Sequence, residues 1–116
     1  MRSVLLALGL VAVAAIVPAR AETIAPAEAK THVGQTVTIK AAVEEVKVGR
    51  AGVTFLDMGG SFPDNSFAAV IFAADLAKFP NAKALKGKTV AISGPVQLYQ
   101  GKPEIILKTA DQLKAD

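Results

Sequence analysis

The sequence predicts an all-β domain with one short helix, in the order β-β-β-α-β-β, closed as a five-stranded barrel. Three observations support this prediction. A long strand pattern over residues 36–48 changes phase once, a helical segment separates the third and fourth strand patterns, and the remaining strand-like runs are short and bounded by glycine, proline or polar turns.

The first predicted strand is the longest. Apolar side chains alternate with more polar ones from Thr36 to Val43, and after Glu44 and Glu45 the alternation continues to Val48 in the other phase. A slip of one residue within a strand is typical of a β-bulge. A long, bent first strand allows a five-stranded sheet to close.

The next two strands are separated by polar, glycine-rich segments. A turn at Gly49–Gly52 leads into a strand at Val53–Met58, and a loop at Gly59–Ser66 leads into a strand at Phe67–Ala73. We expect at least two of the three strand phenylalanines to lie in the core. These are Phe55, Phe67 and Phe72.

The second half of the chain supplies the helix and the last two strands. We expect a short helix at Ala74–Phe79, because Pro80 cannot continue it. The fourth strand runs from Gly87 to Tyr99 and bends at Gly94 and Pro95. The remaining segments are a polar lead-in at Thr23–Lys30, a turn at Gln100–Lys102, a fifth strand at Pro103–Lys108 and a closing helical turn at Thr109–Leu113.

This order of elements is that of the OB-fold, a five-stranded, partly open barrel. An SH3-like barrel lacks the helix between strands three and four, and a sandwich usually needs about seven strands. The domain organisation is therefore a leader at residues 1–21 followed by an OB-fold-like domain at 22–116.

Two stretches carry a more specific resemblance. One runs from Val43 to Phe72, and the other runs from Gly87 through Tyr99-Gln100-Gly101-Lys102-Pro103-Glu104-Ile105 to Leu113. They resemble OB-fold domains of the tRNA-anticodon-binding and helicase type. The loop at 59–65 resembles one in exported bacterial proteins of this type. The resemblance implies single-stranded nucleic acid as the class of ligand.

The first 21 residues have the pattern of a secretory signal peptide. Arg2 is followed by an apolar run from Val4 to Val17 and then by Ala19-Arg20-Ala21. A positive start, a short apolar run and a small-x-small site are the three parts of such a peptide, and the run is too short for an ordinary membrane span. We expect cleavage after Ala21, a periplasmic or secreted protein, and no membrane span after cleavage.

Charge and cysteine content restrict the function. The full chain carries 13 basic and 10 acidic side chains and no cysteine. Cleavage would remove Arg2 and Arg20 and leave 11 basic against 10 acidic side chains, a net charge of +1. This balance lacks the strong basic excess of most electrostatic nucleic-acid binders. Disulfides, thiolate metal sites and a cysteine nucleophile are excluded.

Five residues are candidates for a ligand-binding site. OB-folds bind single strands with aromatic rings and basic side chains, near the loops that follow strands one and four. Lys47 and Arg50 flank the first turn, Lys102 lies on the last turn, and Phe62 and Tyr99 are the aromatic residues best placed for exposure.

No residue set indicates catalysis or a resident metal or cofactor. His32 is the single histidine, and no P-loop or G-x-S-x-G motif is present. Asp57, Asp64 and Asn65 offer oxygen atoms, but their spacing is not that of an EF-hand and suits a turn.

The sequence therefore leaves two binding functions open. The first is a non-enzymatic, periplasmic OB-fold module that binds single-stranded nucleic acid. The alternative is an exported OB-fold domain that binds a protein, a glycan or a small envelope ligand, which the near-neutral charge favours.

Overall fold

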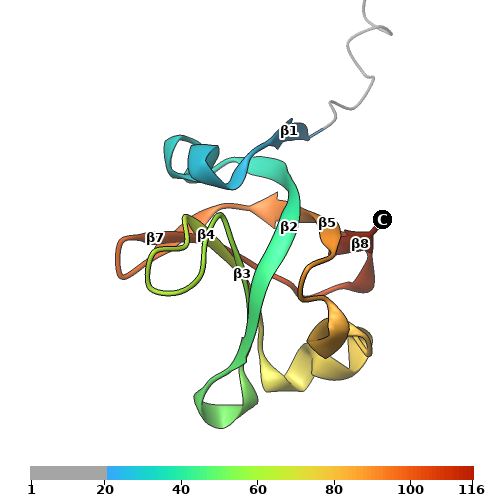
Figure 1. Ribbon diagram of the computed structural model, residues 1–116. Helices are drawn as coiled ribbons and strands as arrows, with labels where there is room; N and C mark the ends of the chain where they lie inside the picture. Colours follow the sequence, from blue (N-terminus) through green and yellow to red (C-terminus); the bar gives the residue numbers. More distant parts are fainter. Residues whose placement is uncertain (1–20) are drawn as a thin grey trace, which may run out of the picture.

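The computed structural model describes residues 21–116 (Figure 1). The predicted signal peptide, except for Ala21, lies outside the described residues. The described part contains eight strands: β1 (Glu22–Ile24), β2 (Thr36–Val48), β3 (Thr54–Met58), β4 (Phe67–Ile71), β5 (Thr89–Pro95), β6 (Gln97–Tyr99), β7 (Lys102–Ile106) and β8 (Leu113–Ala115).

Short 3-10 helices connect these strands. They are η1 (Pro26–Thr31), η2 (Arg50–Gly52), η3 (Ala73–Lys78), η4 (Ala82–Ala84) and η5 (Ala110–Gln112). The helix expected before Pro80 is present as η3, but as a 3-10 helix. Phe79 N–H bonds to the carbonyl of Leu76, three residues back, and Pro80 follows directly.

The long strand β2 organises the sheet. Its first half pairs with β5 and its second half pairs with β3, both antiparallel. The register shifts between Val43 and Glu45, which confirms the predicted bulge. Figure 1 shows β2 running the length of the domain. Pairing with β5 ends at Ala42 and pairing with β3 begins at Val43, so the bulge lies next to the point where the strand changes partner and bends.

The strand order is β6-β7-β4-β3-β2-β5-β8, with β1 parallel to β2. The hydrogen-bonded path does not close on itself. However, β5 and β6 follow one another in the chain with only Val96 between them. The backbone therefore connects the β6 end of the sheet to β5. With β7 parallel to β4 and antiparallel to β6, this is an all-β, OB-like architecture.

The predicted number of five strands is wrong. The fourth predicted strand is divided at Val96, directly after Gly94 and Pro95, into β5 and β6. The lead-in contains β1, and the closing turn η5 is followed by β8. These two short strands were missed because their hydrogen-bond partners, on β2 and β5, are distant in sequence.

The core lies inside the curved sheet. Its largest fully buried side chains include Phe67, Leu56, Ile39 and Ile92. The expectation that at least two of the three strand phenylalanines lie in the core is wrong. Only Phe67 is buried, and Phe72 is exposed. Phe55 is half-buried and faces outward, since its neighbour Leu56 points into the core.

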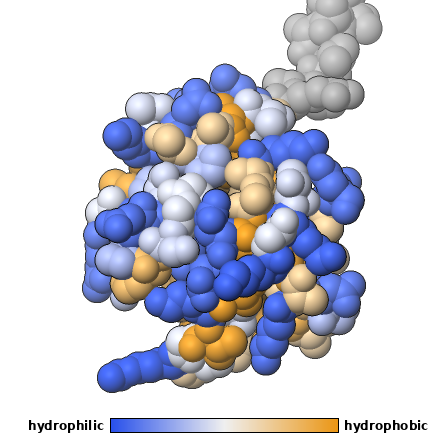
Figure 2. All heavy atoms as spheres, in the orientation of Figure 1, coloured by the Kyte–Doolittle hydropathy of each residue, from blue (hydrophilic) through white to orange (hydrophobic). Residues whose placement is uncertain are grey.

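On the face shown in Figure 2, hydrophobic residues are interspersed with hydrophilic ones. Within residues 21–116, none of the helices has the length and apolar character needed to cross a membrane.

Candidate ligand-binding pocket

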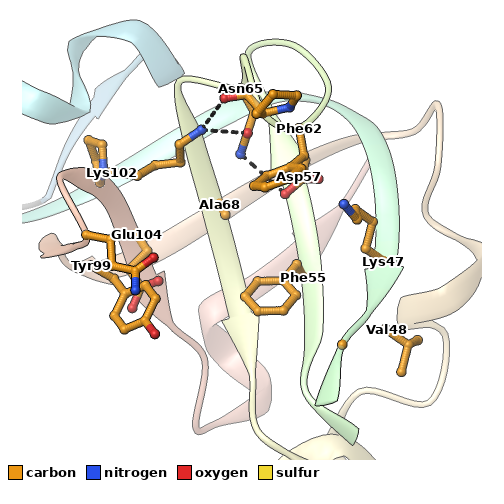
Figure 3. Close-up of a pocket in the computed structure, with 14 residues that line it drawn as sticks. Lys47, Val48, Phe55, Asp57, Phe62, Asn65, Ala68, Tyr99, Lys102 and Glu104 are labelled. Carbon is orange, nitrogen blue, oxygen red and sulfur yellow. Dashed lines mark hydrogen bonds between the residues drawn. The ribbon is translucent and has the colours of Figure 1, made fainter.

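A pocket of about 460 Å³ lies on the outer face of β3, β4 and β7. This volume is within the usual range of small-molecule sites. Figure 3 shows its side chains arranged around Ala68, with Tyr99 and Glu104 on one side and Phe62, Asp57 and Lys47 on the other. The lining comprises Lys47, Val48, Gly49, Phe55, Asp57, Phe62, Pro63, Asn65, Ala68, Tyr99, Gln100, Lys102, Pro103 and Glu104.

Four of the five residues singled out from the sequence line this pocket. Lys47 comes from β2, Phe62 from the loop between β3 and β4, Tyr99 from β6 and Lys102 from β7. Arg50 does not line it and lies in η2, just beyond the pocket residue Gly49. The tertiary fold thus gathers residues from four separate segments.

The two aromatic side chains expected to be exposed are indeed accessible. Phe62 is 58% exposed and Tyr99 is 59% exposed. Lys47 Nζ lies 4.0 Å from the centre of the Phe62 ring, and Lys102 Nζ lies 5.6 Å from it. Both distances are within the range of cation–π attraction.

Lys102 also ties the loop to β7. Its Nζ donates to the carbonyl of Pro63 at 2.7 Å and to Asn65 Oδ1 at 2.8 Å. Asn65 Nδ2 in turn donates to the carbonyl of Phe67 at 3.1 Å and to Asp57 Oδ1 at 3.3 Å. These bonds hold the loop across the outer face, and with it the position of Phe62.

Asp57 is a buried acid in this pocket. It is 2% exposed, and its Oδ2 has no hydrogen-bond partner among the described residues. Burial raises the pKa of Asp57 above its ordinary value, while the charges of Lys47 and Lys102 act in the opposite direction.

Glu104 is a second buried acid. It is 8% exposed, and its Oε2 accepts a hydrogen bond from Gln97 Nε2 at 2.9 Å. Burial also raises the pKa of Glu104, and the bond from Gln97 partly offsets this. The pocket therefore combines two basic and two acidic groups with aromatic rings.

Ten of the fourteen lining residues were not among the sequence candidates, and four of these ten, Phe55, Asp57, Asn65 and Glu104, carry aromatic, acidic or amide side chains. Strand alternation already places Phe55 and Asp57 on one face of β3, and Glu104 belongs to the Tyr-x-Gly-x-Pro-Glu-Ile stretch. Asn65 follows Asp64 in a turn-like segment, and nothing local indicates that its amide reaches Asp57. These residues are far apart in the chain, so the sequence alone does not indicate that they lie close together.

The described residues contain no group of three or more histidine, cysteine, aspartate or glutamate side chains arranged to hold a metal ion. What the pocket offers is hydrogen-bond acceptors, ammonium donors and aromatic surface. This set suits non-covalent recognition of a planar or polar ligand.

Several aminoacyl-tRNA synthetase chains contain a region similar to this structure. The asparaginyl-tRNA synthetase of Entamoeba histolytica, in complex with asparaginyl-adenylate, matches 84% of this chain with a TM-score of 0.55 and 23% identity. A Leishmania major chain assigned as an aspartyl-tRNA synthetase matches 86% with a TM-score of 0.53 and 14% identity. The matched regions are 24% and 21% of those chains, so this chain has the fold of about one quarter of each synthetase.

A Klebsiella pneumoniae lipoprotein assigned to nucleic acid binding matches over 78% of both chains, with a TM-score of 0.45 and 18% identity. No protein-family model matches the sequence, and no curated protein matches it either.

Proposed function

We propose that this protein is a non-enzymatic module that binds single-stranded nucleic acid through the outer face of β3, β4 and β7. The observation that carries the proposal is the pocket itself, where Phe62 and Tyr99 are exposed beside Lys47 and Lys102. Aromatic rings that stack on bases, next to cations that attract the backbone, are the two components of single-strand binding by OB-folds.

The roles divide by chemistry. Phe62 and Tyr99 supply ring faces for stacking, and Lys47 and Lys102 supply charge at the edge of the pocket. Arg50, outside the pocket on η2, extends the positive charge beyond Gly49 for a strand that runs past the pocket. The sequence resemblance to anticodon-binding OB-folds and the structural likeness to part of two synthetases support this proposal.

The test is fluorescence anisotropy of residues 22–116 with labelled oligo-dT and oligo-U at low salt. Phe62→Ala should weaken binding by about 5- to 150-fold, because loss of one base–aromatic stack costs roughly 1–3 kcal/mol. Phe72→Ala is the matched control, since Phe72 is exposed but does not line the pocket. Absence of binding at low salt would contradict the proposal.

We also propose that the protein is exported. The support is the signal-peptide pattern of Arg2, the apolar run and Ala19-Arg20-Ala21. In a bacterial host, the mature protein should appear in the periplasmic fraction with Glu22 as its first residue. A cytoplasmic protein that retains Arg2 would contradict this.

A second candidate function is binding of a protein, a glycan or a small envelope ligand. It is favoured by the net charge of +1 over residues 22–116, which is low for a polyanion binder. If oligonucleotides do not bind, thermal-shift screening against envelope glycans and small metabolites, with Phe62→Ala as the comparison, tests this candidate.

A further inference from the structure

The floor of the pocket has a feature that attraction of a phosphate backbone does not explain. Asp57 and Glu104 are buried acids, and each would repel a phosphate group placed at the floor. If a nucleic acid occupies the pocket, another part of the nucleotide must therefore face these two side chains.

The two acids lie in one row across the sheet. Asp57 on β3 pairs with Ala68 on β4, and Ala68 pairs with Glu104 on β7. Adjacent strands are about 4.8 Å apart, so the two acidic positions are separated by roughly 10 Å with an alanine between them. Figure 3 shows Ala68 between Glu104 and Asp57, and its small side chain does not fill the space between the two acids.

Each acid has one oxygen that accepts no hydrogen bond from the described residues. Asp57 Oδ1 is engaged by Asn65, whereas Asp57 Oδ2 has no partner among the described residues. Glu104 Oε2 is engaged by Gln97, and the hydrogen bonds of the described residues include none to Glu104 Oε1. Asp57 Oδ2 is buried and has no donor, which is costly, and a ligand N–H that bonds to it would remove that cost.

The rest of the pocket indicates a flat, neutral ligand group. The pocket lining contains two lysines, Lys47 and Lys102, and two acids, so its formal charges cancel without a further cation, and both lysines act on the charge of Asp57. The aromatic rings of Phe55, Phe62 and Tyr99 line the same space and suit a planar ring. A nucleobase that carries N–H donors meets both requirements.

We infer that the pocket holds one unpaired guanine base, with its N–H donors directed at Asp57 and Glu104. This inference rests on the proposed single-strand binding. Guanine has the N1–H and the exocyclic N2–H₂ as adjacent donors, whereas thymine and uracil have a single N3–H donor between two carbonyl oxygens, which acidic side chains repel.

The experiment compares oligo-dT with oligo-dT that carries one central guanine, each labelled, against residues 22–116. Guanine should strengthen binding by about 5- to 150-fold, the discrimination of a good side-chain–base pair. Hypoxanthine, which lacks the N2 amine, should lie between the two. Asp57→Asn and Glu104→Gln should each bring the guanine-to-thymine affinity ratio closer to one, because an amide NH₂ would face the donors of the base.

Two control variants separate recognition from general effects. Glu45→Gln neutralises an acid on β2 that pairs with Asp57 across the sheet. This variant should leave the guanine-to-thymine affinity ratio unchanged, because Glu45 does not line the pocket. Arg50→Met should weaken binding of both oligonucleotides and also keep the ratio. Urea unfolding of each variant establishes that it is folded.

The outcomes distinguish this inference from the proposed function. If neither oligonucleotide binds, the proposed function fails. If both bind with equal affinity, or if the guanine preference persists in both Asp57→Asn and Glu104→Gln, guanine recognition by the acids is overturned while single-strand binding stands.

Discussion

Lys102 shows how one side chain combines structure and binding. It joins β7 to the loop through Pro63 and Asn65, and it lies within cation–π range of Phe62. A lysine that served only to attract phosphate would extend into solvent, where it keeps its rotamer entropy. The position of Phe62 therefore depends on Lys102.

The first prediction concerns this tie. Lys102→Met should lower the free energy of unfolding by about 1–2 kcal/mol, because two hydrogen bonds from a charged donor are lost at a partly exposed site. It should also speed amide hydrogen exchange in residues 59–66. Lys40→Met is the control, since Lys40 makes an exposed pair with Asp116 at 3.6 Å and should change stability by less than about 0.5 kcal/mol.

The second prediction concerns pH and Asp57. Burial raises the pKa of Asp57 above its ordinary 3.8, so the folded state retains the proton to a higher pH than the unfolded chain. Between the pKa of the unfolded chain and that of the folded state, the folded state binds more protons. The free energy of unfolding therefore falls as the pH rises through this window, with a slope of about 1.4 kcal/mol per pH unit where the difference in bound protons approaches one.

Urea unfolding of the wild type and of Asp57→Asn from pH 3 upward measures this effect. The wild type should lose stability relative to Asp57→Asn as the pH rises above 3.8, because the variant has no proton to release. A stability difference that stays constant with pH would contradict the role of burial at Asp57.

At the scale of elements, two irregularities allow the sheet to curve. The bulge in β2 lies next to the point where this strand changes its partner from β5 to β3. Gly94, at the end of β5, has φ +153° and lies against Ile105 and Gln112. A side chain at this position would enter the space where β5, β7 and η5 meet.

The third prediction follows from this close approach. A Cβ at position 94 would lie 2.8 Å from Ile105 Cγ2 and 2.9 Å from Gln112 Nε2. Gly94→Ala should therefore destabilise the domain by about 2–4 kcal/mol, from overpacking together with backbone strain. Gly87→Ala is the control, because Gly87 has φ +82° but no atom within 4 Å of the added Cβ, so it should cost about 1–2 kcal/mol. Equal losses in urea unfolding would contradict a steric role for Gly94.

At the scale of the whole molecule, the charge balance limits the electrostatic part of binding. Residues 22–116 carry a net charge of +1. Three cations, Lys47, Arg50 and Lys102, lie in or next to the pocket region. Affinity from this surface must therefore come largely from stacking and hydrogen bonds.

The fourth prediction is a shallow salt dependence. Each phosphate neutralised on a single strand contributes about −0.7 to the slope of log K against log salt, so three cations give about −2. Anisotropy titrations from low to moderate salt should give a slope no steeper than this. A slope near −5 would mean that cations elsewhere on the surface bind the strand.

The sequence by itself determined the order of the main strands, the bulge after Val43 and the presence of a short helix before Pro80. These depend on side-chain alternation and on proline, which act over a few residues. It also pointed to Lys47, Phe62, Tyr99 and Lys102, because a known architecture places the loops after strands one and four on one face.

Only the tertiary structure decided the strand count and the composition of the pocket. β1 and β8 exist because β2 and β5 offer backbone hydrogen-bond partners from distant parts of the chain. Asp57 and Glu104 share a pocket because Ala68, on the strand between theirs, pairs with both. Hydrogen bonding between strands joins residues that are 47 positions apart, and no local pattern contains that information.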